Sequence, residues 1–189
     1  MKIGLFFGSF NPVHNGHLII ANYVRETTDL DKVWFVVSPQ NPFKEKHTLL
    51  NERDRFHLVQ LAIEGNDHLR ASDIEFKLPK PSYTIDTLTH LREKYPTYDF
   101  SLIMGGDNLN SLQKWKNYEL ILANHDIYVY KRAPTDINPF PDRNIHFLDV
   151  PLLDISATFI REHIQQGHSM QYFLPDRVWD YVRDYNLYK

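Results

Sequence analysis

The chain has 189 residues, 42% of them hydrophobic and 24% charged, which predicts one globular domain large enough to bury a core. Its formal net charge of −3 excludes the broad basic surface that nucleic-acid binding requires, and the absence of cysteine excludes disulfides and cysteine-based metal centres. No apolar run approaches the ~20 residues of a membrane helix, and the N-terminus lacks the features of a signal peptide. We therefore expect a cytoplasmic protein that binds neither nucleic acid nor membrane.

Strands and helices alternate along the whole sequence. In chain order we predict a strand at residues 3–7, a helix from 17, a strand at 33–37, a helix after 51, a strand at 70–76, a helix after 84, a strand at 99–104, a helix at 118–123, strands at 127–130 and 145–150, and helices at 158–166 and 175–185. This alternation predicts the α/β class, a Rossmann-like doubly wound parallel sheet with helices on both faces. We expect a single domain over residues 1–189, in which residues 156–189 form a small, mostly helical C-terminal part.

The unusual residues of the chain lie in the loops that follow the predicted strands. In open parallel sheets, ligands bind outside the carboxyl ends of the strands. The loops after residues 7, 37, 104 and 150 should therefore contribute to one ligand site.

The loop after the first predicted strand carries two glycines and two histidines, Gly8, His14, Gly16 and His17. Gly8 lets the backbone approach a ligand at the strand end, and Gly16 does the same at the start of the next helix. A helix N-terminus presents free N–H groups that suit a phosphate. The two histidines stand three residues apart, so their rings can converge there and donate hydrogen bonds to phosphoryl oxygens.

Two other interpretations of this segment stay open from the residues alone. His14 and His17 could cap the helix over a tight turn, or they could form an HxxH metal pair, although no third ligand stands nearby. Residues 8–17 resemble the (H/T)xGH motif of the nucleotidyltransferase superfamily, whose members transfer a nucleotidyl group and release pyrophosphate. The resemblance implies that both histidines are catalytic. The residues that would bind ATP in this segment are Gly8, Ser9, Phe10 and Gly16.

A second group of polar residues stands near the end of the chain, at Ser156, Thr158 and Arg161. Ser156 and Thr158 offer hydroxyls at another predicted helix start, and Arg161 offers a planar fork for phosphate oxygens one turn later. Alone, this pattern is also typical of an ordinary capped helix. It resembles the ISSTxIR signature of the same superfamily, which grips the ATP phosphates, with Ala157 in place of the second serine.

The middle of the chain distinguishes between the families that share these two motifs. Residues 81–87 resemble the SYTxDT segment of bacterial nicotinate-mononucleotide adenylyltransferases, and residues 105–108 with Trp115 resemble their GxD…W segment. Residues 38–44 stand where that family carries a PPHK-like loop, and its lysine is retained as Lys44. The resemblance covers almost the whole chain.

The resemblance also implies roles for residues in these middle segments. Trp115 offers a flat face to a pyridine ring, and Tyr83 and Thr84 lie at a helix start whose donors could meet a ring carboxylate. Gly105 and Asp107 would contact ATP, with Asp107 hydrogen-bonding ribose hydroxyls. Each has an ordinary structural interpretation as well: Trp115 in the core, Thr84 in a helix cap and Asp107 in a turn.

The implied reaction transfers the adenylyl group of ATP to nicotinate mononucleotide, yielding nicotinate adenine dinucleotide and pyrophosphate in NAD biosynthesis. The attacking phosphate is already anionic, so catalysis requires positioning and charge stabilisation rather than a general base. His14 and His17 would hold the phosphates, while Lys44 and Arg161 would neutralise the departing pyrophosphate. Mg²⁺ should accompany ATP with mostly water ligands, and the sequence indicates no dedicated metal ligands.

Alternatives to this function stay open at this point. The chain could be a related adenylyl- or cytidylyltransferase with another phosphate acceptor, or a non-catalytic regulatory module that binds a nucleotide. Asn11 and Phe43 depart from the family, which commonly has aspartate and histidine at those positions. The sequence also leaves the oligomeric state open, and a homo-oligomer is compatible with it.

Overall fold

A sheet of six parallel strands forms the centre of the part of the chain that the structure describes. The computed structural model describes residues 1–39, 49–130, 138–151 and 153–189. The strands are β1 (Lys2–Gly8), β2 (Lys32–Val37), β3 (Leu69–Ser72), β4 (Asp99–Gly105), β5 (Ile127–Tyr130) and β6 (Ile145–Leu148). They pair in the order β3-β2-β1-β4-β5-β6, which is the doubly wound order of a Rossmann-like fold. The predicted fold class is confirmed.

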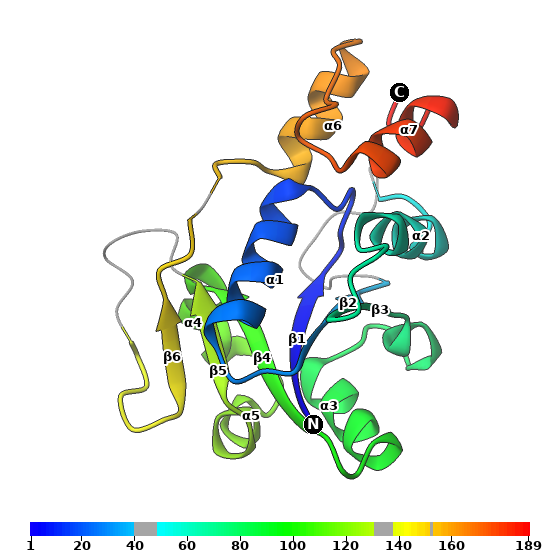
Figure 1. Ribbon diagram of the computed structural model, residues 1–189. Coiled ribbons are helices and arrows are strands. Elements are labelled where there is room, and N and C mark those ends of the chain that lie inside the picture. The colour runs from blue at the N-terminus through cyan, green and yellow to red at the C-terminus, as the bar shows by residue number, and fades with distance from the viewer. Residues whose placement is uncertain (40–48, 131–137, 152) are drawn as a thin grey trace.

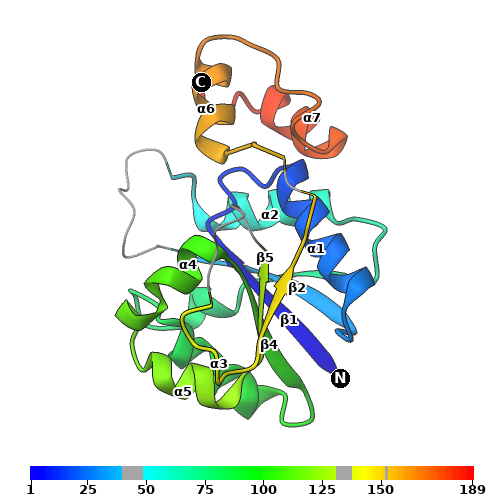
Figure 2. The ribbon, with the colours of Figure 1, turned by 90° about the vertical axis from the view of Figure 1, so that its left-hand side faces the viewer.

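Helices cover both faces of this sheet, as Figure 1 and Figure 2 show. One face carries α1 (Asn15–Thr27) and α2 (Glu52–Ala62), and the other carries α3 (Thr84–Lys94), α4 (Gly106–Ser111) and α5 (Tyr118–Asn124). The remaining helical elements are the 3-10 helices η1 (Ile74–Lys77) and η2 (Leu112–Lys114) and the helices α6 (Ala157–Gln165) and α7 (Asp176–Asp184). Within the described ranges, none of the helices is long and apolar enough to cross a membrane.

Alternate residues of the inner strands point into two separate cores. In β1, Ile3 and Leu5 join the core beneath α3, α4 and α5, whereas Phe6 joins the core beneath α1 and α2. In β2, Trp34 and Phe35 divide between the two cores in the same way. Successive side chains of a strand point to opposite faces, so a strand covered on both sides must be apolar at consecutive positions.

The C-terminal helices α6 and α7 lie beyond the carboxyl end of the sheet (Figure 1). Their apolar residues, including Ile160 and Val178, belong to the same core as those of α1 and α2. Asn15 at the start of α1 donates from its backbone to the Phe173 carbonyl at 3.0 Å and from its side chain to the Tyr172 carbonyl at 2.9 Å. The C-terminal part therefore contacts the loop that follows β1, while the single-domain organisation stays a prediction.

The structure differs from the predicted elements after β3 and after β4. β3 ends at Ser72 and is followed by the 3-10 helix Ile74–Lys77, so the predicted strand at 70–76 is wrong beyond Ser72. The reason is Glu75, which is buried and accepts hydrogen bonds from hydroxyls of a neighbouring segment. α4 is not predicted from the sequence, because it begins after two consecutive glycines, at 105–106, which are poor helix formers.

Candidate active site

The candidate site lies where the strand order reverses, between β1 and β4. These strands are neighbours, yet the helices that follow them, α1 and α4, lie on opposite faces of the sheet. In open α/β sheets this arrangement leaves a crevice outside the carboxyl ends of the strands. Gly8 ends β1, Gly105 ends β4, and Asp107 is exposed in the first turn of α4. Three of the predicted ligand residues therefore lie at the carboxyl ends of β1 and β4.

His14 and His17 lie face to face at the start of α1. Their ring centroids are 3.7 Å apart and their planes are tilted by 30°. His14 is the N-cap residue, and its backbone N–H donates to Nδ1 of His17 at 3.2 Å. A ring nitrogen that accepts a hydrogen bond carries no proton, so neutral His17 has its proton on Nε2.

Phe10 and the two glycines of this loop have structural tasks. The Phe10 ring is buried, its centroid lies 5.1 Å from that of His17, and its φ of 45° is in the left-handed region. A Cβ atom on Gly8 would lie 2.8 Å from the Phe10 ring, and one on Gly16 would lie 3.1 Å from the His14 ring. The glycines therefore make room for side chains of the loop itself, and only the backbone of Phe10 can face a ligand.

Arg161 connects the two predicted motifs. From α6 its Nη1 donates to the Asn11 carbonyl at 2.8 Å, and its Nη2 donates to the Thr158 hydroxyl at 3.2 Å. Asn11 belongs to the loop after β1, 150 residues earlier in the chain. The Ser156 hydroxyl accepts the Phe159 N–H at 3.1 Å, which confirms Ser156 as the cap of α6. The motif at the start of α6 therefore contacts the loop that carries the histidine motif.

Asn11 fixes the same loop from its other side. Its side-chain oxygen accepts the Leu50 N–H at 3.2 Å and the Tyr188 hydroxyl at 3.0 Å. Burial raises the pKa of Tyr188, which keeps that hydroxyl protonated as a donor. An amide oxygen makes these contacts without burying a charge, so asparagine suits this position. The predicted Lys44 lies in residues 40–48, outside the residues that the structure describes.

Arg55 supports the site and was not identified by the sequence analysis. It lies in α2, is fully buried, and donates only to backbone carbonyls among the described residues. The accepting carbonyls are those of Ser9, Ser38 (2.9 Å), Pro39 (3.1 Å) and Leu50 (2.9 Å). Burial lowers the pKa of Arg55. The signal in the sequence was its position, because Arg55 shares the buried face of α2 with Leu58 and Val59.

The residues predicted to bind the acceptor lie at and beside the start of α3. Tyr83 is the N-cap residue and Thr84 is the first residue of the helix, and the Tyr83 side chain forms no capping bond. Lys116, the neighbour of Trp115, pairs with Asp86 at 2.9 Å and lies 4.9 Å from the centre of the Tyr83 ring. Trp115 is half-buried against the core beneath α3, α4 and α5. The two predicted acceptor segments therefore adjoin.

Sequence comparisons show the family to which this chain belongs. The family model described as cytidylyltransferase-like matches residues 5–163. A relative from Flavobacterium psychrophilum, named probable nicotinate-nucleotide adenylyltransferase, is 58% identical over 100% of both chains. The chain belongs to the nicotinate-nucleotide adenylyltransferase family. A relative of the same name from Bacteroides fragilis is 47% identical over 94% of this chain and 89% of its own.

Solved structures of nicotinate-nucleotide adenylyltransferases share this fold over nearly the whole chain. The Plasmodium falciparum nicotinic acid mononucleotide adenylyltransferase complexed with NaAD has a TM-score of 0.79 at 19% identity. The similarity covers 99% of this chain and 97% of that one. At this low identity the likeness supports the fold, and the relatives of higher identity support the family.

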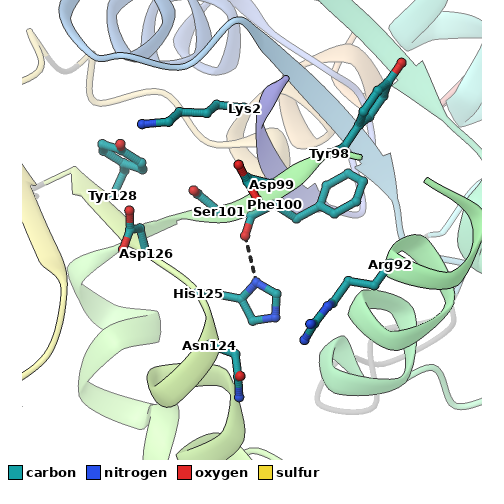
Figure 3. Close-up of a pocket in the computed structure, with 10 residues that line it drawn as sticks. All are labelled: Lys2, Arg92, Tyr98, Asp99, Phe100, Ser101, Asn124, His125, Asp126 and Tyr128. Atoms are coloured by element: carbon teal, nitrogen blue, oxygen red, sulfur yellow. Dashed lines mark hydrogen bonds between the residues drawn. The ribbon is translucent and has the colours of Figure 1, made fainter. Parts of the chain in front are cut away.

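A pocket at the other end of the sheet lies away from the candidate site. It has a volume of about 280 Å³ and is lined by residues at the amino ends of β1, β4 and β5, together with Arg92 of α3 (Figure 3). Its buried His125 hydrogen-bonds the Phe100 carbonyl through Nδ1 at 2.7 Å, and burial lowers the pKa of His125. The predicted nucleotide residues lie at the carboxyl ends of the strands, so this pocket is separate from them.

Proposed function

We infer that this chain transfers the adenylyl group of ATP to nicotinate mononucleotide and releases pyrophosphate. The product is nicotinate adenine dinucleotide, an intermediate of NAD biosynthesis. The observation that carries the inference is the 58% identity, over the full length of both chains, to a relative named probable nicotinate-nucleotide adenylyltransferase. The crevice between β1 and β4, with its paired histidines and its arginine, provides the charge and the donors that such a reaction needs.

The proposed chemistry is an attack of the acceptor phosphate on the α-phosphorus of ATP. A new P–O bond forms, and the bond from that phosphorus to the β-phosphate oxygen breaks, so pyrophosphate leaves. The attacking group is an anion, which makes positioning and charge stabilisation the main contributions of the protein. His14 and His17 would hold the α- and β-phosphates.

Arg161 would neutralise the pyrophosphate as charge develops on it. Two of its nitrogens already hold Asn11 and Thr158, at 2.8 and 3.2 Å. A guanidinium has five N–H donors, so the remaining ones are available for phosphate oxygens. Lys44, which lies outside the described residues, would share this task.

ATP would lie across the carboxyl ends of β1 and β4. The proposed contacts with it come from Gly8, Ser9, the Phe10 backbone, Gly16, Gly105, Asp107, Ser156 and Thr158. Asp107 is exposed in the first turn of α4, where its carboxylate can accept from ribose hydroxyls. Tyr83, Thr84 and Trp115 would bind the ring of the acceptor.

Mg²⁺ would reach the site as part of its complex with ATP. Within the described ranges, no group of three or more His, Asp or Glu side chains is arranged to hold a metal ion. We propose that the ion binds phosphate oxygens and water. The ion would reduce the negative charge of the triphosphate.

Pyrophosphate release from ATP, measured with a panel of acceptors, tests the proposed function. We expect rapid release with nicotinate mononucleotide, slower release with the nicotinamide form, and none with phosphopantetheine or when CTP replaces ATP. Faster turnover of another acceptor or of CTP would assign the chain to a related transferase. Binding of ATP without release, whichever acceptor is added, would indicate a regulatory module.

A further inference from the structure

Glu75 is a buried carboxylate that the proposed mechanism does not use. It lies in η1, between β3 and the segment that leads to α3, and is 2% exposed. Its Oε1 accepts the Thr87 hydroxyl at 2.9 Å, and its Oε2 accepts the Ser82 hydroxyl at 3.0 Å. The Ser38 hydroxyl also hydrogen-bonds this carboxylate. Among the described residues, hydroxyl groups rather than cations thus replace the water that burial removes from Glu75.

These three hydroxyls come from the start of α3, where the acceptor is proposed to bind, and from the carboxyl end of β2. Ser82 directly precedes the N-cap residue Tyr83. Thr87 lies in the first turn of α3, where its backbone N–H donates to the Tyr83 carbonyl at 3.1 Å. Ser38 follows the last residue of β2. The Glu75 carboxylate therefore hydrogen-bonds one residue before α3 and one in its first turn, and connects both to the residue that follows β2.

This connection matters because the Tyr83 side chain does not cap the helix. Backbone N–H groups at an uncapped helix start can bind an anionic ligand, provided that the first turn is held in a fixed direction. Lys116 holds the outer side of this turn through Asp86 at 2.9 Å. Glu75 is the corresponding support on the buried side.

We propose that Glu75 is a positioning residue for the acceptor, which acts through Ser82 and Thr87 to direct the N-terminus of α3 toward the nicotinate ring. This role rests on the proposed function, because it requires that α3 binds the acceptor. Glu75 itself touches neither substrate. Its removal should therefore affect binding of the acceptor and leave the handling of ATP unchanged.

The test measures KM for nicotinate mononucleotide and for ATP, together with kcat, in purified full-length variants. Glu75→Leu keeps the approximate volume and removes both accepting oxygens, and Thr87→Val removes one hydroxyl with little change of shape. We expect Glu75→Leu to raise KM for nicotinate mononucleotide about tenfold and Thr87→Val to raise it less, with kcat and KM for ATP within about twofold of wild type. Glu75→Gln should stay close to wild type, because its amide can accept from Thr87 and donate to Ser82.

Thr89→Val is the matched control in the same helix. The Thr89 hydroxyl is exposed and donates to the Ile85 carbonyl at 2.9 Å, one turn away and without contact to Glu75. This variant removes the same chemical group from α3 as Thr87→Val does. Both KM values should therefore stay at their wild-type levels.

A folded Glu75→Leu protein with unchanged KM for nicotinate mononucleotide, or with an equal rise in KM for ATP, would overturn the proposal. If that variant fails to fold, Ser82→Ala and Thr87→Val decide the matter, since each removes only one hydroxyl. Unchanged acceptor KM in both of them overturns the proposal as well. Wild-type protein that does not convert nicotinate mononucleotide would instead refute the proposed function, so the two failures are distinguishable.

Discussion

His17 has its hydrogen-bonding pattern set before any ligand arrives. Its Nδ1 accepts the His14 N–H at 3.2 Å, and its ring packs edge-on against Phe6 and Phe10, with centroids 6.0 and 5.1 Å away. Donors that are already oriented need no rearrangement when charge develops on a reacting phosphate. The contribution of His17 should therefore appear in the reaction rate more than in stability.

We expect His17→Ala to lower kcat/KM for adenylyl transfer by about 100-fold or more while the fold is preserved. Pyrophosphate release gives the rate, and circular dichroism checks the fold. His68→Ala is a suitable control, because His68 is exposed beside the amino end of β3, away from the candidate site. If His17→Ala is as active as that control, His17 does not hold a reacting phosphate.

Arg161→Lys separates the geometry of the guanidinium from its charge. Arg161 holds the Asn11 carbonyl and the Thr158 hydroxyl with two nitrogens, and a lysine ammonium cannot span both and also face a phosphate. We expect KM for ATP to rise about tenfold. Arg177→Lys in α7 is the control, since Arg177 is an exposed arginine paired with Glu64. Unchanged ATP kinetics in Arg161→Lys would leave Arg161 with a purely structural role.

The motif residues could be predicted from the sequence, whereas the residues that support them could not. His14 and His17 lie close together in the chain, at a strand-to-helix junction that local patterns reveal. Arg55 hydrogen-bonds the Ser9 carbonyl 46 residues away, and Glu75 accepts from Thr87 12 residues away. Those contacts exist only after the sheet has formed. Buried arginine and glutamate also contradict the usual preference of charged residues for the surface, so composition points away from them.

At the level of secondary structure, the proposed acceptor site at the start of α3 predicts which acceptor the enzyme prefers. A helix N-terminus favours an anion by about 0.3–1 kcal/mol. The NH₂ group of a nicotinamide would face backbone N–H groups donor to donor, and an unmatched buried polar group costs about 1–3 kcal/mol. Together these effects predict a preference for the acid over the amide of roughly ten- to a thousand-fold in kcat/KM.

Trp115→Ala tests whether stacking is independent of that preference. The Trp115 ring can stack on either pyridine ring, so its loss should raise KM for both mononucleotides and leave their ratio nearly unchanged. The measurement is kcat/KM for the two acceptors side by side. A large change in the ratio of the two kcat/KM values would indicate that Trp115 itself distinguishes the carboxylate from the amide.

Most helices were predictable because apolar residues recur along them at helical spacing, and most strands because they are short continuous apolar runs. The prediction failed for the residues after Ser72, where Glu75 turns inward to hydroxyls of α3 and its approach, and this contact outweighs the local pattern. It also failed for α4, which begins at Gly106 immediately after β4. Both failures lie beside the candidate site, and functional sites are where sequence-level reasoning is expected to fail.

On the scale of the whole molecule, the carboxyl ends of β1 and β2 are joined through the buried guanidinium of Arg55. We expect Arg55→Met to lower the free energy of unfolding by about 3 kcal/mol or more, because it leaves several buried carbonyls without donors. Arg53→Met is the matched control, two residues away in the same helix and exposed. Urea denaturation measures both variants, and an equal loss of stability in the two would contradict a structural role for Arg55.

The fold class followed from the alternation of elements, but the path of the C-terminal part did not. α6 and α7 return to the loop after β1, and the hydrogen bond from Arg161 to Asn11 spans 150 residues of chain. No local pattern encodes such a contact. It arises because the apolar faces of α6 and α7 join the core of α1 and α2.

The bond from the Tyr188 hydroxyl to the Asn11 side chain spans 177 residues. Ribosomes add about 5–20 residues per second, so the first loop waits roughly 9 to 35 s for this last partner. During that time β1 and α1 can form, but the loop after β1, which we propose contacts ATP, lacks one of its hydrogen bonds. We expect a nascent chain to bind ATP only weakly until Tyr188 has been added and can reach Asn11.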